Sequence, residues 1–150
     1  MGIKQTIDAD LKQALLSGDK DKSSILKVIK SVILDAEIAK NKRDDGLGEQ
    51  ELVDLLQKEA KKRDDTAEIY KKAADEGREN AEKAEADLIR SYLPEQMGED
   101  EIKKIVDEVI GSEPAEMKDM GRFIGLVKTK TGSSADGATI ARLVKEKIGQ

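Results

Sequence analysis

The stretch Leu93-Pro94-Glu95-Gln96-Met97-Gly98 divides the sequence into two parts. Proline disfavours helical backbone at the residue before it, and glycine can stand at the N-cap of the helix that follows. The sequence therefore predicts one part over residues 1–93 and a second over residues 94–150. Apolar residues recur at helical spacing on both sides, and no run alternates as a β-strand would. The predicted fold class is all-α, with two helical subdomains.

The first two predicted helices meet at a short turn. The first should end at Gly18, because glycine readily adopts the left-handed backbone of a helix C-terminus. Asp19 then caps the second helix, which should end near Asn41. The apolar positions are Ile3, Ile7, Leu11 and Leu15 in the first helix and Ile25, Ile29, Val32, Ile33 and Ala36 in the second.

A long third helix is predicted to begin after Gly48. Its apolar positions thin out along its length, and it should run to about Asp75, where Gly77 breaks it. A fourth helix then leads to the boundary at Pro94. The apolar positions are Leu52, Leu55, Leu56, Ala60, Ala67 and Tyr70 in the third helix and Ala81, Ala84, Leu88 and Tyr92 in the fourth.

Three shorter helices are predicted after the boundary. The first should stop at Gly111-Ser112, and Asp136 is the expected N-cap of the third. Their apolar positions are Ile102, Val106, Val109 and Ile110, then Met117, Met120, Ile124 and Val127, then Ala141, Val144 and Ile148.

The composition excludes several kinds of chemistry. The 150 residues include no Cys and no His, which removes thiolate sites and the commonest general base. Gly132-Ser133-Ser134 resembles the glycine–serine loops of serine amidases but has no α/β scaffold around it, so a turn is the better interpretation. The pairs Asp44-Asp45 and Asp64-Asp65 lack the ligand spacing of a cation loop. We assign no catalytic residue, no metal site and no cofactor.

No apolar run approaches the ~18 residues of a membrane-spanning helix. The first residues, Met1-Gly2-Ile3-Lys4-Gln5, lack the apolar core of a signal peptide. The expectation is a cytoplasmic protein without membrane contact.

Charge is distributed unevenly along the chain. The net charge is −5, which does not favour nucleic acid overall. Residues 117–150, however, contain seven Lys or Arg against three acids, a local excess of four positive charges. A second basic cluster is followed at once by acids, and a solvated face is the better interpretation there. It consists of Lys58, Lys61, Lys62 and Arg63.

Two glycines, Gly121 and Gly125, share one face of a predicted helix with the basic residues Lys118 and Arg122. Each glycine costs about 1 kcal/mol relative to alanine, so some benefit should offset them. One interpretation is close helix packing, and the other is a smooth strip for a phosphate backbone.

The last helix carries Arg142 and Lys145 on one face. These residues either contact phosphate or form a solvated, cationic last turn that complements the helix dipole. We expect this face to lie beside that of Lys118 and Arg122. The candidate nucleic-acid-binding residues are Lys118, Gly121, Arg122, Gly125, Lys128, Lys130, Arg142 and Lys145.

Several stretches together resemble the YqeY family. They are Leu26-Lys27-Val28-Ile29-Lys30-Ser31, Asp35-Ala36-Glu37-Ile38, Gln57-Lys58-Glu59-Ala60-Lys61-Lys62-Arg63, Tyr92-Leu93-Pro94-Glu95-Gln96, Met117-Lys118-Asp119-Met120-Gly121 and Leu143-Val144-Lys145-Glu146-Lys147. The last third is similar to the tail of the B subunit of tRNA-dependent amidotransferases (GatB). The resemblance implies that residues 94–150 adopt the tail fold, which in that enzyme helps to hold tRNA during amidation. Related tails often carry a basic residue just after the glycine of this turn, where this chain has Ser133 and Ser134.

The first functional hypothesis is a non-catalytic module that binds tRNA or a tRNA-modifying or aminoacylation complex. The resemblance also implies a second, an accessory subunit of a carbon–nitrogen ligase that uses glutamine as amide donor. A third is a protein–protein adaptor that uses the long third helix. The missing catalytic residues predict no enzymatic activity by the protein alone.

Overall fold

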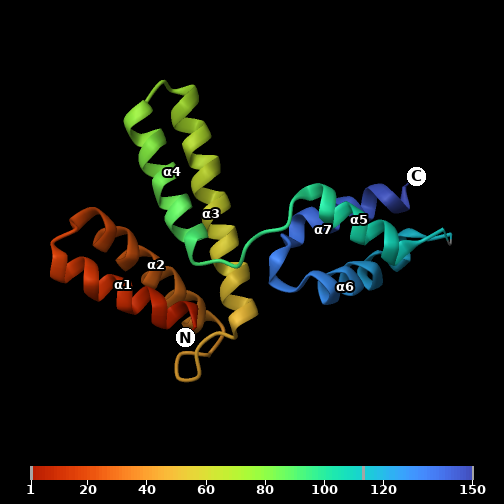
Figure 1. Ribbon diagram of the computed structural model, residues 1–150, viewed down its shortest axis with the longest axis horizontal. Helices are drawn as coiled ribbons and strands as arrows, with labels where there is room; N and C mark the ends of the chain where they lie inside the picture. Colours follow the sequence, from red (N-terminus) through yellow and green to blue (C-terminus); the bar gives the residue numbers. More distant parts are fainter. Residues whose placement is uncertain (1, 113, 150) are drawn as a thin grey trace. The chain divides into compact units, whose positions relative to one another are not determined.

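The computed structural model describes residues 2–112 and 114–149, apart from the side chain of Ser133. All regular secondary structure in these ranges is helical, which confirms the predicted fold class. The chain divides into two compact units, Met1–Leu93 and Pro94–Gln150. The helices are α1 (Ile3–Ser17), α2 (Lys20–Ala39), α3 (Glu49–Lys72), α4 (Glu76–Ser91), α5 (Glu99–Ile110), α6 (Met120–Thr131) and α7 (Gly137–Ile148), with short 3₁₀ turns η1 (Met117–Asp119) and η2 (Gly132–Ser134) (Figure 1).

The helix ends at three predicted positions are confirmed. Gly18 terminates α1 with a left-handed backbone, φ +76°. Asp19 caps α2 by accepting a hydrogen bond from the Lys22 backbone N–H at 3.1 Å. Asp136 caps α7 in the same way, with the Thr139 N–H at 3.1 Å. Each Asp cap satisfies a backbone donor that has no partner inside the helix, and the Gly18 N–H satisfies helix carbonyls.

The turn between α3 and α4 differs from the prediction. α3 ends at Lys72, three residues before the predicted Asp75, and Ala74 takes a left-handed backbone, φ +57°. Asp75 is the N-cap of α4, because its carboxylate accepts the Arg78 N–H at 3.1 Å. Gly77 therefore lies in the first turn of α4 and does not break α3. The two helices lie side by side as a hairpin (Figure 1).

The apolar face of α4 was predicted only in part, because Leu88 and Tyr92 pack against the core as expected but the two alanines do not. Ala81 and Ala84 are exposed, whereas Ala86 and Ile89 are buried. An ion cluster also joins α4 to α3, through Glu82 and Glu85 of α4.

The centre of this ion cluster is Arg63 of α3, whose side chain is only 14% exposed. Its guanidinium lies 3.1 Å from Glu59 and 3.8 Å from Glu82, and it also pairs with Glu85. The Arg63 Nε is buried without a hydrogen-bond partner among the described residues. Lys58, Lys61 and Lys62 are exposed, as expected of a solvated face, but Arg63 is not part of that face.

Each unit has its own apolar core. In the first unit the Tyr92 hydroxyl donates to Asp10 at 2.6 Å and joins the end of α4 to α1. Burial raises the pKa of the Tyr92 hydroxyl above its ordinary value, and the Asp10 carboxylate raises it further. The buried cluster of this unit consists of Ile7, Leu26, Ile29, Ile33, Leu52, Leu56, Ala60 and Ile89.

The core of the second unit lies between α5, α6 and α7. The segment before α5 is tied to η2, because the Met97 N–H donates to the Ser134 carbonyl at 2.7 Å. The buried cluster consists of Ile102, Val106, Ile110, Phe123, Val127, Ala135, Ile140, Leu143 and Val144.

Candidate functional site

The glycine face of α6 is open. Gly121 and Gly125 are exposed, on the side of the helix away from the buried Phe123 and Val127. A Cβ added at either glycine would find no described atom within 4 Å, apart from its own helix backbone. Close packing against another described helix therefore does not account for these glycines.

Two cations flank the glycine strip. The Lys118 side chain is 77% exposed, and its ammonium lies 3.2 Å from Glu116. The Arg122 side chain is 64% exposed, and its guanidinium lies 3.8 Å from Asp119. The same guanidinium stands 4.6 Å from the centre of the Phe123 ring, an arrangement in which the ring face attracts the cation. Both side chains can turn towards a phosphate at little cost, because exposed ion pairs contribute little to stability.

Arg142 is in a different position. Its guanidinium pairs with Glu99 of α5 and lies 3.1 Å from Glu146. The hydrogen bond that the guanidinium donates to Glu99, and then the one it donates to Glu146, raises the pKa of Arg142. Among the described residues its ion-pair partners lie on α5 and α7 and none lies on α6. Arg142 thus has two carboxylate partners, whereas the described ion pairs of Arg122 involve Asp119 alone.

The remaining predicted cations lie around α6 and α7. Lys128, Lys130 and Lys145 are exposed. The Lys128 Cε lies 3.7 Å from the position of a Cβ built on Gly137, so this side chain extends along the start of α7. Within the second unit the face around Gly121 is therefore built mainly by α6 and η1.

The serine turn between α6 and α7 has a structural role. The Ser134 carbonyl holds the Met97 N–H, and Gly132 supplies a left-handed backbone, φ +58°, at the end of α6. The Ser133 side chain, which stands where related tails often carry a cation, lies outside the described residues.

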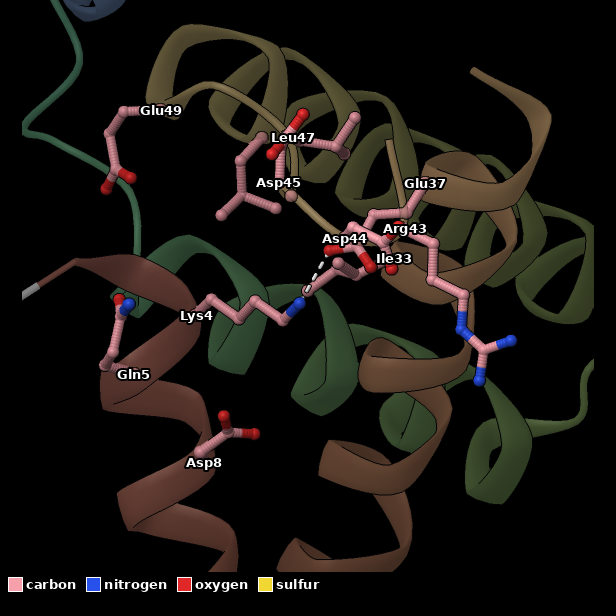
Figure 2. A pocket seen from close by; sticks show the side chains of 12 residues that line it. Lys4, Gln5, Asp8, Ile33, Glu37, Arg43, Asp44, Asp45, Leu47 and Glu49 are labelled. Carbon is pink, nitrogen blue, oxygen red and sulfur yellow. Dashed lines mark hydrogen bonds and ion pairs between the residues drawn. The ribbon is translucent and has the colours of Figure 1, made fainter. Parts of the chain in front are cut away.

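A polar pocket in the first unit was not predicted from the sequence. It has a volume of about 300 Å³ and lies between the starts of α1 and α3, the end of α2 and the 40–48 loop (Figure 2). Glu37 reaches it from α2 and is only 2% exposed. The Lys4 ammonium donates to Glu37 Oε1 at 2.7 Å. The sequence did hold a signal, because Glu37 continues the i, i+4 ladder of Ile29 and Ile33 and so falls on the buried stripe of α2.

A clamp holds the loop that borders this pocket. The Lys40 ammonium lies 3.1 Å from one oxygen of Glu51, and Lys42 pairs with the other. These hydrogen bonds, with Lys42 contributing most, lower the pKa of Glu51 from its ordinary 4.5 to about 2. The clamp therefore links the start of the loop to the first turn of α3.

Replacing Glu51 by glutamine is expected to make the free energy of unfolding less dependent on pH in the acidic range. A carboxylate whose pKa is lower in the folded state stabilises the fold above its unfolded pKa, and this contribution is lost as the pH falls. For Glu51 the loss should occur between about pH 4.5 and pH 2. The measurement is urea unfolding of wild type and variant at several pH values between 7 and 2.5. Glu68→Gln, an exposed carboxylate on the same helix, is the matched control. If the free energy of unfolding fell equally with decreasing pH in wild type and Glu51→Gln, the stabilising role of the clamp would be contradicted.

Two further kinds of site are not found. Among residues 2–112 and 114–149, no three acidic side chains come together in a way that could hold a metal ion. No described helix combines the length and apolar character needed to cross a membrane.

Residues 4–148 match the protein family described as Yqey-like protein. No curated protein matches the chain. Because the family match covers nearly the whole sequence, the chain belongs to this family.

Proposed function

We propose that the protein is a non-catalytic helical module that binds the phosphate backbone of tRNA through the face of α6. The observation that carries this proposal is the open strip at Gly121 and Gly125, where an added Cβ would meet no described atom within 4 Å beyond its chain neighbours and its own helix backbone. Glycine lowers the stability of a helix, and here it makes no close contact with another described helix. Both observations are explained if another molecule must come close to the backbone.

The charges around the strip support contact with phosphate. Lys118 and Arg122 are mostly exposed, and Arg122 presents the planar donor geometry that suits phosphate oxygens. No exposed aromatic ring accompanies them, since Phe123, the one Phe of the sequence, is buried. The contact should therefore follow the backbone of the RNA rather than stack on its bases.

The resemblance to the amidotransferase tail supports tRNA as the RNA. In that enzyme the corresponding part helps to hold the substrate tRNA, while the ATP and glutaminase chemistry lies elsewhere. We infer a tRNA-handling role without amide-transfer activity by this chain alone. An accessory role in a carbon–nitrogen ligase complex would use the same surface.

Reversing Lys118 and Arg122 to glutamate is expected to weaken tRNA binding at least about tenfold, since two phosphate contacts become repulsions. Binding by the wild type should be weak and should fall with salt, with a log–log slope of about −2 to −4 for two to four neutralised phosphates. The measurement is a fluorescence anisotropy titration of labelled tRNA at two salt concentrations. Lys61→Glu with Lys62→Glu makes the same charge change on the exposed face of α3 and is the matched control.

A second variant separates contact from charge. Gly125→Leu adds a side chain to the open strip, leaves every charge in place and should not destabilise α6, because leucine is a better helix former than glycine. Reduced tRNA binding with unchanged or higher thermal stability is the expected result. Equal binding by wild type and both variants, or binding independent of salt, would overturn the proposal and favour a protein–protein adaptor.

A further inference from the structure

Two adjoining cavities in the first unit share an ion pair. The polar pocket described above has a volume of about 300 Å³, and a second cavity of about 330 Å³ lies between α1 and α2. Lys4, Asp8, Ile33 and Glu37 line both. The two cavities form one groove, with the Lys4–Glu37 pair at its middle. The α1–α2 end is walled by apolar side chains such as Ile7 and Leu34.

The carboxylate at the centre of the groove has spare acceptor capacity. An ionised carboxylate can accept about four hydrogen bonds. Among the described residues, Glu37 receives only the one from Lys4, at 2.7 Å, although its side chain is 3% exposed. Keeping a charged group away from water is costly unless donors surround it. A further cationic donor beside Lys4 would therefore be stabilised here.

Acids outnumber bases along the groove. Asp44, Asp45 and Glu49 line its polar end in addition to Asp8 and Glu37. Lys30 lies 2.7 Å from Asp8 and offsets that charge. In Figure 2 the Lys4 ammonium points to Glu37, whereas the Arg43 guanidinium extends away from the pair. An excess of negative charge therefore remains between Glu37 and the loop.

These negative charges are spread out. The described acids do not gather as a group that could hold a metal ion. Charges spaced along a partly apolar groove match a long, multivalent cation with methylene segments between its charges. The Lys4 side chain already shows the geometry, since it brings an alkylammonium group to Glu37 (Figure 2).

We propose that this groove binds a linear aliphatic polyamine. A central ammonium group donates to Glu37 beside Lys4. One methylene arm lies along Ile33 and Leu34, and the other arm carries a second ammonium group to Asp44 and Asp45. The proposal concerns the first unit and does not depend on RNA binding by the second.

The test is an NMR titration of the full-length, ¹⁵N-labelled protein with spermidine. Saturable shifts of the amides of residues 43–47 and of the start of α1 are expected. A neutral aliphatic diol of similar length and magnesium chloride are the comparison probes, and both should give much weaker shifts at these amides. Spermidine shifts that never saturate, or that the diol or Mg²⁺ reproduces, would overturn the proposal.

Variants locate the binding. Glu37→Gln is expected to weaken spermidine binding at least about tenfold, the loss typical of one charge-assisted hydrogen bond. Asp44→Asn with Asp45→Asn changes only exposed loop residues and tests the other end of the groove without risk to the core. It should weaken binding several-fold. Asp100→Asn with Glu101→Gln removes two exposed charges from α5 and should leave the affinity unchanged. Equal weakening by this control and by the loop variant would show non-specific attraction and overturn the site.

Discussion

Replacing Arg63 by methionine is expected to destabilise the first unit by about 3 kcal/mol. The guanidinium is the shared partner of Glu59, Glu82 and Glu85, whose side chains are 14%, 23% and 27% exposed. Without it, three carboxylates lie together at the α3–α4 interface with no cation between them. Their partial exposure places the loss at the low end of the range for broken buried pairs. Urea unfolding followed by circular dichroism measures it.

Two comparisons isolate the cause of that loss. Arg90→Met removes a guanidinium from the same interface, where Arg90 pairs with Asp64, but both side chains are more than 40% exposed and the cost should stay below about 1 kcal/mol. Adding Glu82→Gln and Glu85→Gln to Arg63→Met should restore most of the stability, because the unpaired charges are then gone. Equal losses for Arg63→Met and Arg90→Met, or no recovery in the triple variant, would show that the cluster does not hold the hairpin together.

The elements that the sequence predicted well depend on local interactions. The turn between α1 and α2 follows from Gly18 and Asp19 alone, because a left-handed C-cap and a side-chain N-cap need no distant partner. The N-cap at Asp136 is equally local. Helical spacing of Ile, Leu and Val residues likewise placed most of the buried faces, although Leu15 of the first helix is 53% exposed.

The α3–α4 turn could not be predicted in the same way. Gly77 and Asp75 both mark a helix boundary, and the choice between them depends on Ala74, whose left-handed backbone is uncommon for alanine. The ion cluster between α3 and α4 pairs Arg63 with Glu85, which lies twenty-two residues later in the chain. A hydrophobic pattern does not reveal an ion cluster that crosses between helices.

In the candidate site, too, local features could be predicted from the sequence, whereas contacts between distant residues could not. Two glycines in a helix are compatible with packing or with an open strip, and only the absence of described neighbours around Gly121 and Gly125 distinguishes them. The pairing of Arg142 with Glu99 connects residues far apart in sequence and was not visible in the charge count. The placement of Lys118 and Arg122 beside the glycines followed from helical spacing.

Replacing Leu56 by alanine is expected to cost the first unit about 2–5 kcal/mol while leaving the second unit folded. The Leu56 side chain is fully buried, in a cluster whose members all precede residue 94. The buried cluster of the second unit begins at Ile102 and shares no residue with it. Unfolding should therefore separate into two transitions, with an early loss of amide signals from residues before 94 and a later loss of those after it.

The size of the loss identifies its source. Leu56→Ala loses the free energy gained by burying three carbons and leaves a cavity in the core. The same truncation at Leu126, which is 44% exposed on α6, should cost less than about 0.5 kcal/mol. NMR spectra recorded across a urea series follow both units in one experiment. If Leu56→Ala lowered the midpoints of both units equally, the two cores would be energetically coupled. Variants that weaken the polyamine groove would then also have to be checked for effects on the RNA-binding face. If only the first midpoint falls, the two proposed binding surfaces can be altered and measured separately.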